Sequence, residues 1–277
     1  MGVVFQNYAL FPHMSVAENV AFPLKQRRVG RAETQERVPR ALDMVQLSHT
    51  VDRRPGMLSG GQQQRIALVF EPSVVLMDEP LGALDKQLRE QMQLDIRDLH
   101  RRLGLTIVFV THDQSEALTM SDRIAVFNHG RIDQIGPPAE IYDRPAPRFV
   151  TEFIGETNLL PGKVAEVSDG LMRVRLDAGP VIAVTPDGHA AGDAVLVSVR
   201  PERLRIQPSD AAPVAGTRNI QPVHVEDCVY QGDHIRLHLK DGPLRLIARI
   251  DRSQPVPEIG SRARIHFAAH DCWIVKP

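Results

Sequence analysis

Cysteine, surplus charge and long apolar runs are scarce in this 277-residue sequence. The two cysteines, Cys228 and Cys272, form no Cys-x-x-Cys motif, so we expect reduced thiols in a cytoplasmic protein and not a disulfide scaffold. Lys and Arg number 33 against 34 Asp and Glu, which argues against nucleic acid or anionic lipid as a partner. No apolar run approaches the ~20 residues that span a bilayer, and the first residues lack the basic start of a signal peptide. A membrane role would therefore need a partner.

A phosphate-binding motif is absent as well. The pattern Gly-x-x-x-x-Gly-Lys-Ser/Thr, whose backbone amides cradle nucleotide phosphates, occurs nowhere in these residues. The nearest approach, Gly162-Lys163, is followed by Val164. A phosphate cradle of this type is therefore excluded from the sequence as it stands.

The first half does contain short apolar runs that end in polar groups. Gly2–Phe5, Val74–Met77 and Thr106–Val110 do not alternate with polar residues, which predicts parallel strands buried on both faces. Ligands lie beyond the carboxyl ends of the strands in open α/β sheets, so the residues that follow these runs are candidates for a site. They are Gln6, Asp78, Glu79 and His112.

Helical patterns separate these strands. Ser15-x-x-Glu18 predicts a capping box that opens a helix over Val16–Phe22, with Pro23 ending it. The segment Arg31–Leu47 is helical in composition, but Pro39 predicts a break into two helices.

Two further helices are expected downstream. Apolar residues repeat at helical spacing from Leu84 to Leu103, which predicts a core-facing helix that Gly104 closes in a left-handed cap. A capped helix is expected from Ser115 towards Met120. Strands that alternate with helices predict an α/β fold.

The segment Leu58-Ser59-Gly60-Gly61-Gln62 predicts a helix start with little side chain around it. Ser59 and Gln62 can form a capping box, and the two glycines leave the first N–H groups uncovered at the positive end of the helix dipole. Such a start can bind an anion, above all a phosphate. A capped surface helix with two glycines is the alternative, and these residues alone leave both open.

Together these motifs resemble those of ATP-binding cassette (ABC) transporter ATPases. Leu58–Gln62 is similar to the family signature, Val74–Glu79 to Walker B and Gly82–Asp85 to the D-loop. His112 stands at the switch histidine and Gln6 at the Q-loop glutamine. The resemblance covers the chain except for a front end that would hold the phosphate cradle (Walker A).

The resemblance implies a role for each of these residues. Asp78 would hold Mg²⁺, with Gln6 as a second metal contact. Glu79 would orient and deprotonate the attacking water, and His112 and Gln6 would sense the γ-phosphate of ATP. Each of these residues also has a purely structural interpretation when it is taken alone. Asp78 or Glu79 could be an N-cap or part of a solvated turn, and His112 could be a residue without a functional role. The residues that would bind nucleotide are Ser59, Gly60, Gly61, Gln62 and Asp85. Of these, the signature residues Ser59–Gln62 would act on nucleotide held by an opposite subunit.

The hydrophobic pattern of the sequence changes after residue 155, from helical spacing to short alternating runs. Short alternating runs such as Leu171–Leu176 and Leu244–Ile250 are separated by turns such as Asp169-Gly170, which predicts a small, OB-like β-barrel. The region resembles the TOBE domain of ABC importer ATPases, most clearly at Val199–Ile206. It lacks an aromatic stacking series and a basic stripe, so we expect no nucleic-acid binding. The predicted architecture is α/β: a partial ABC ATPase (P-loop NTPase-like) domain over residues 1–155, then a small OB-like β-barrel TOBE domain over residues 156–277.

The implied function is that of an ATP-binding and ATP-hydrolysing subunit that energises import of a small, polyamine-like solute. Its cofactors would be ATP and Mg²⁺, and its partners a second ATPase subunit, identical or full-length, and transmembrane permease subunits. Asn7–His13 resembles a segment of the groove that receives a permease helix, although a proline-containing loop with ordinary apolar contacts explains it too. The location would be peripheral, at the cytoplasmic face of the inner membrane.

Two departures support an alternative function. Without the cradle, the chain should bind ATP poorly in its own half-site. The segment Arg65–Pro72 that follows the signature is also shorter than in the family by about four residues, or one helical turn. Both suggest a truncated or decaying copy of an ATPase gene. Such a chain would be a catalytically incomplete subunit that acts through dimerisation, or it would not act at all.

Overall fold

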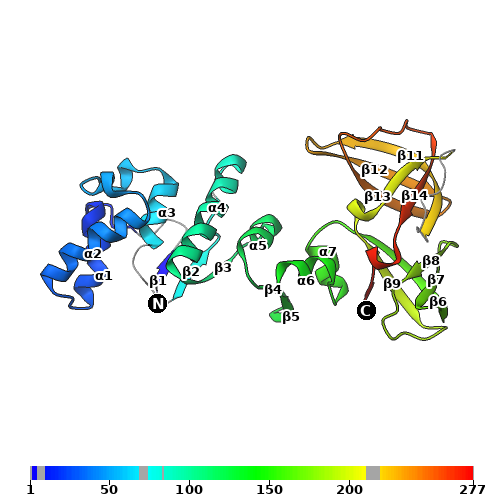
Figure 1. The fold of residues 1–277 in the computed structure, drawn as a ribbon, viewed down its shortest axis with the longest axis horizontal. Coiled ribbons are helices and arrows are strands. Elements are labelled where there is room, and N and C mark those ends of the chain that lie inside the picture. Colours follow the sequence, from blue (N-terminus) through cyan, green and yellow to red (C-terminus); the bar gives the residue numbers. More distant parts are fainter. Residues whose placement is uncertain (1, 5–9, 69–73, 83, 210–218, 277) are drawn as a thin grey trace. The chain divides into compact units, whose positions relative to one another are not determined.

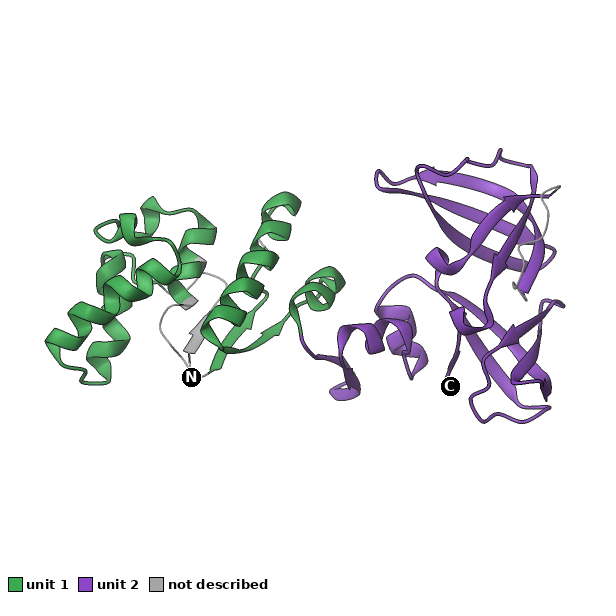
Figure 2. Cartoon of the chain, viewed as in Figure 1, with its two compact units in different colours: residues 1–121 green, residues 122–277 purple. Residues whose placement is uncertain are grey.

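The computed structural model describes residues 2–4, 10–68, 74–82, 84–209 and 219–276 (Figure 1). The chain divides into two compact units, residues 1–121 and residues 122–277 (Figure 2). Within the described ranges, no helix is both long enough and apolar enough to cross a membrane.

The first unit contains a three-stranded parallel sheet in the order β1-β2-β3. Its strands confirm the three apolar runs expected from the sequence: β1 (Gly2–Val4), β2 (Val74–Asp78) and β3 (Thr106–Val110). In the register of the sheet, Asp78 lies beside Val110. The carboxyl ends of β2 and β3 therefore lie next to each other.

The expectation that these strands are buried on both faces is wrong for β3. Val75 and Met77 of β2 are buried in one core with the surrounding helices. On β3, however, Val108 is 52% exposed and Val110 is 57% exposed. The core formed by the described residues covers one face of the sheet, and an apolar run in the sequence does not say how many faces are covered.

Helices surround this core, and they show why the strands lie where they do. One helix contributes Met92, Ile96 and Leu99 at helical spacing, and another contributes Ile66. All four are buried in the same core as Val75 and Met77. The helices of the unit are α1 (Val16–Gln26), α2 (Arg31–Met44), α3 (Gly60–Leu68), α4 (Lys86–Leu103) and α5 (Gln114–Met120).

The two helix breaks expected at prolines are wrong. α1 runs through Pro23 to Gln26, because the ring removes one N–H donor while the Pro23 carbonyl still accepts from Arg27, and Leu24 is buried in the core. α2 likewise continues through Pro39, since Val38 and Leu42 are buried on its inner face. Packing of the apolar face outweighs the single hydrogen bond that each proline loses.

Helix caps follow the sequence more closely. The Ser15–Glu18 capping box is present, and Gly104 closes α4 in the left-handed conformation with φ of 59°. The start of α5 differs from the expectation, because Asp113 and not Ser115 is its N-cap. The Asp113 carboxylate accepts hydrogen bonds from the backbone N–H groups of Ser115 and Glu116.

The second unit contains two five-stranded sheets, in the orders β10-β14-β11-β12-β13 and β15-β9-β6-β7-β8. Their inward residues share one apolar core, which includes Val197 from the second sheet and Leu237 from the first. The predicted hairpin at Asp169-Gly170 joins β6 to β7, and both turn residues have positive φ. The strands are β6 (Asn158–Ser168), β7 (Leu171–Leu176), β8 (Val181–Val184), β9 (Ala194–Val199), β10 (Arg205–Pro208), β11 (Asn219–Tyr230), β12 (His234–Asp241), β13 (Leu244–Asp251), β14 (Arg262–Phe267) and β15 (Cys272–Val275).

The same unit begins with a hairpin and two short helices. These are β4 (Ile124–Asn128), β5 (Arg131–Gly136), α6 (Pro138–Asp143) and α7 (Arg148–Phe153). Trp273 of β15 donates its indole N–H to the carbonyl of Pro145, and Lys276 donates its backbone N–H to the carbonyl of Ala146. These contacts tie the segment between α6 and α7 to β15 and the residue after it, within the unit that starts at residue 122. The predicted domain boundary after residue 155 stays a prediction.

Arg200 is the main polar link between α6, α7 and the sheets. Its side chain is buried and donates to the carbonyls of Tyr142, Thr151, Gly155 and Glu156. Its guanidinium also lies over the Tyr142 ring, 4.3 Å from the centroid. Burial and a hydrogen bond to Glu202 raise the pKa of Tyr142 to about 12, so the phenol stays protonated as a donor.

Candidate nucleotide site

Glu79 and His112 meet at the carboxyl ends of β2 and β3. Nε2 of His112 lies 3.1 Å from Oε1 of Glu79. Both side chains reach solvent, with His112 85% exposed and Glu79 42% exposed. The pairing follows from the parallel register, because each residue lies just beyond the end of its own strand.

The backbone at Glu79 is strained. Its φ is +43°, a left-handed value that is unusual for a residue other than glycine. Its N–H donates to the carbonyl of Val110 at 3.0 Å, and its carbonyl accepts from Gly82 at 3.3 Å. Strain of this kind is found most often where a side chain must be aimed at a ligand.

Asp78 ends β2 immediately before this pair, and its side chain is exposed. Carboxylate oxygens are the donor type that Mg²⁺ prefers in proteins. Asp78 offers such a donor here, and its predicted contact with Mg²⁺ stays a prediction. Gln6, the other predicted metal contact, lies outside the described residues.

Asp85 has a structural role that the sequence did not assign to it. Its carboxylate is the N-cap of α4 and accepts from the Leu88 N–H at 3.0 Å. One carboxylate oxygen can still reach a ligand, because Asp85 is exposed. Its predicted contact with nucleotide stays a prediction.

The start of α3 forms the expected capping box. The Ser59 N–H donates to Oε1 of Gln62 at 3.0 Å, and the Gln62 N–H donates to Oγ of Ser59 at 3.4 Å. Ser59 is exposed and Gly60 is half-buried, so the helix start is open to an anion.

Gly61 differs from its neighbours because it is buried against α4. A Cβ at this position would lie 2.6 Å from Sδ of Met92, which is itself buried. Gly61 therefore lets α3 pack closely on α4, whatever it does for a phosphate.

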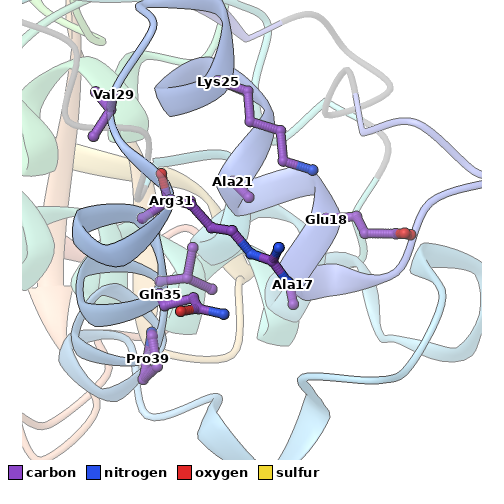
Figure 3. A pocket seen from close by; sticks show the side chains of 10 residues that line it. Ala17, Glu18, Ala21, Lys25, Val29, Arg31, Gln35 and Pro39 are labelled. Carbon is purple, nitrogen blue, oxygen red and sulfur yellow. The ribbon is translucent and has the colours of Figure 1, made fainter.

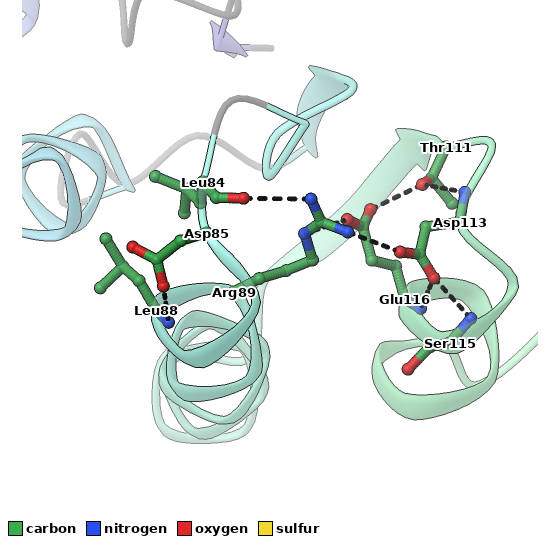
Figure 4. A network of polar contacts seen from close by, with 8 residues as sticks. All are labelled: Leu84, Asp85, Leu88, Arg89, Thr111, Asp113, Ser115 and Glu116. Carbon is green, nitrogen blue, oxygen red and sulfur yellow. Dashed lines mark hydrogen bonds and ion pairs between the residues drawn. The ribbon is translucent and has the colours of Figure 1, made fainter. Parts of the chain in front are cut away.

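A polar network next to the site was not found by the sequence reasoning. Arg89 of α4 pairs with Asp113, while Glu116 and Thr111 hydrogen-bond to each other beside it (Figure 4). The sequence signal was the pattern Asp113-x-x-Glu116, which is typical of a helix start. Nothing in the pattern showed that the Glu116 side chain would be 2% exposed.

The segment predicted to receive a permease helix is described in part. Asn7, Tyr8 and Ala9 lie outside the described residues. Phe11 is fixed by Asn19, whose side-chain oxygen accepts from the Phe11 N–H at 2.7 Å and whose amide donates to the Phe11 carbonyl at 3.1 Å. The Phe11 ring also packs against Phe22, with centroids 4.7 Å apart.

A separate hollow of about 670 Å³ lies between α1 and α2 (Figure 3). Its apolar wall includes Ala21, Val29 and Val38, and Lys25 and Arg31 are among its charged lining residues. None of the predicted nucleotide or metal residues lines it.

Comparisons with known proteins identify the family. Residues 1–82 match the family described as ABC transporter, and residues 197–275 match the TOBE domain. The two family matches leave residues 83–196 between them, and relatives that align over nearly the whole chain include both matched regions.

Three relatives illustrate this. A spermidine/putrescine import ATP-binding protein, PotA 1, of Pseudomonas aeruginosa is 48% identical over 88% of this chain and 67% of its own length. The PotA proteins of Ruegeria pomeroyi and Rubrobacter xylanophilus are each 45% identical, over 95% and 99% of this chain and over 70% and 74% of their own lengths. These findings confirm the predicted family and fold class: the chain belongs to the ABC transporter ATP-binding proteins that carry a TOBE domain.

Proposed function

We propose that this chain is the ATP-hydrolysing subunit of an importer. The observation that carries the proposal is the contact between Glu79 and His112 at the end of the parallel sheet. A carboxylate and an imidazole held 3.1 Å apart, both open to solvent, can hold a water and move its proton.

Each residue of the site has a separate task in this proposal. The Glu79 carboxylate orients the attacking water and takes its proton, while His112 donates a hydrogen bond towards the terminal phosphate. Asp78 would hold a Mg²⁺ ion through its exposed carboxylate. When bound, that ion would neutralise charge on the phosphates of the substrate ATP.

The α3 start acts on phosphate held by a second subunit. Ser59, Gly60 and Gln62 offer a hydroxyl, backbone N–H groups and an amide at the positive end of the α3 dipole. Two further roles rest on the family motifs alone: Gln6 would contact the metal and the γ-phosphate, and Asp85 would contact the nucleotide.

The names of the relatives support the proposed solute, and the family motifs support the proposed partners. The named relatives are spermidine/putrescine import ATP-binding proteins, so the solute proposed for this chain is a polyamine or a similar small cation. The partners are a second ATPase subunit and permease subunits, and the chain works at the cytoplasmic face of the inner membrane.

One observation favours a second candidate function. Residues 1–277 contain no Gly-x-x-x-x-Gly-Lys-Ser/Thr motif, the pattern whose backbone amides and lysine cradle nucleotide phosphates. The second candidate is a subunit that offers its α3 start to a partner's ATP but does not hydrolyse ATP by itself.

Equilibrium binding separates the two candidates. The purified full chain is titrated with a fluorescent ATP analogue, with Mg²⁺ and with EDTA in its place. An ATPase predicts saturable binding that Mg²⁺ strengthens and that Asp78→Asn weakens, while the control Asp98→Asn, on the outer face of α4, leaves binding unchanged. Binding that is absent, or equal in EDTA, supports the second candidate and contradicts the first.

A further inference from the structure

The guanidinium of Arg89 joins two segments that carry proposed site residues (Figure 4). Its Nη2 donates to the carbonyl of Leu84 at 3.0 Å, and its Nη1 pairs with Oδ2 of Asp113 at 2.9 Å. Leu84 directly precedes Asp85, and Asp113 directly follows His112. The Arg89 side chain therefore holds the residue next to Asp85 and the residue next to His112.

Hydrogen bonds fix the loop on both sides of His112. The Thr111 hydroxyl donates to Oε2 of Glu116 at 2.6 Å and accepts from the Asp113 N–H at 3.0 Å. Asp113 in turn caps α5 through Ser115 and Glu116. With Thr111 and Asp113 held, few backbone positions remain for His112 between them.

Charge explains why an arginine is needed. The Glu116 carboxylate is 2% exposed, and burying a carboxylate is costly unless a cation lies near it. Nε of Arg89 lies 3.9 Å from Oε1 of Glu116, and Arg89 is itself 29% exposed. A guanidinium can serve Leu84, Asp113 and Glu116 at once because its donors form a planar fork, whereas a lysine offers a single point charge.

We infer that Arg89 is a positioning residue of the site: it holds the Thr111–Asp113 loop so that the His112 imidazole meets Glu79. It touches neither the nucleotide nor the reacting water. The inference rests on the proposed function, but the contact that it explains, His112 to Glu79, can be measured without any turnover of ATP.

The test reads His112 directly. The full chain is labelled with ¹⁵N-histidine, and the imidazole signals of His112 are assigned by their loss in His112→Gln. Glu79→Gln gives the His112 signals expected when the contact is broken. Arg89→Met should move the His112 signals towards those of Glu79→Gln, and Arg89→Lys should move them part of the way. Arg97→Met, an exposed arginine of the same helix, should leave them in place.

Three results would overturn the inference. The first is an unchanged His112 signal in a folded Arg89→Met chain, and the second is an equal change in Arg97→Met. The third applies if Arg89→Met does not fold: the spectra of Arg89→Lys and Asp113→Asn are then measured, and unchanged His112 signals in both variants would overturn the inference.

Turnover gives a second readout. Arg89→Met should lower kcat for ATP about tenfold or more at a similar KM, because misplacing a catalytic group by about 1 Å lowers the rate and leaves binding unchanged. If the unsubstituted chain hydrolyses no ATP, the proposed function fails while the His112 spectra still decide the role of Arg89.

Discussion

Polar side chains in the core of the second unit and at the strand ends of the first unit are used in opposite ways. In residues 122–277, Arg200, Asn158 and Asn219 are buried, and each is hydrogen-bonded to several backbone groups of the same unit. In residues 1–121, Glu79 and His112 lie at the surface, at strand ends, and pair with each other.

This difference distinguishes buried polar groups that stabilise the fold from exposed polar groups that can contact a ligand. Asn158 donates to the carbonyls of Val199 and Ile247 and accepts from the Ile247 N–H, so both of its side-chain N–H donors are used within the unit. Glu79 keeps a strained backbone and an exposed carboxylate. Glu116 of the first unit is the contrasting case: its carboxylate is buried and lies near Arg89, so it belongs with the groups that hold the fold.

The largest expected effect comes from removing the buried cation of the second unit. Arg200→Met should lower the free energy of unfolding by about 3 kcal/mol, since several buried carbonyls lose their donor at roughly 1 kcal/mol each. Urea unfolding is followed through Trp273, the single tryptophan, whose indole N–H bonds to Pro145 in the same unit.

The matched control is Arg203→Met. Arg203 is 49% exposed and its ion pairs with Asp143 and Asp271 are long, at 3.4 Å and 3.7 Å, so its loss should cost less than about 1 kcal/mol. Equal losses for the two substitutions would mean that burial of Arg200 does not hold this unit together.

A smaller effect is expected at the N-cap of α4. Asp85→Ala should lower the free energy of unfolding of the first unit by about 1 kcal/mol, because the Leu88 N–H loses its acceptor. Asp85→Asn keeps a capping oxygen and should cost only a few tenths of that. The helical circular dichroism signal in urea is the measurement, and an equal loss in both variants would show that the carboxylate does not act as a cap.

The smallest expected effect is a pH dependence in the second unit. Burial, with a contribution from Arg205, lowers the pKa of His266, so the folded chain favours the neutral imidazole. The unfolded chain then takes up the proton first as the pH falls below the ordinary value of about 6.5. The stabilisation from neutral His266 is therefore present above that value and is lost as the pH falls through the lower pKa of the folded state.

His266→Gln isolates this contribution. The urea midpoint, read through Trp273, should fall less between about pH 8 and about pH 5.5 in His266→Gln than in the unsubstituted chain. The same fall in both chains would show that His266 does not titrate with unfolding.

Much of the second unit could be predicted from the sequence. Alternating runs such as Leu171–Leu176 correspond to β7 residue for residue, and the turn at Asp169-Gly170 is present. Alternation specifies a strand with one buried face, which matches the burial of β7. The prediction of a TOBE domain is confirmed by the family match.

The first unit was harder to predict in its details. Pro23 and Pro39 lie inside helices because tertiary packing decides helix length, and the sequence shows the proline without showing the core. Val108 and Val110 are exposed because the number of layers on a sheet depends on elements far away in the chain. The pairing of Glu79 with His112 followed from strand order, but Arg89 did not, since its partners depend on how α4 packs against α5.

The central claim is that Glu79 performs phosphoryl-transfer chemistry at the end of β2. Its most direct test is ATP turnover by the full chain, unsubstituted and as Glu79→Gln, with Glu90→Gln on the exposed side of α4 as the control. Loss of the general base should lower kcat roughly a hundredfold or more in Glu79→Gln, with ATP binding retained, while Glu90→Gln turns over normally. Turnover that is equal in Glu79→Gln and the unsubstituted chain, or absent from both while the chain is folded, would contradict the account.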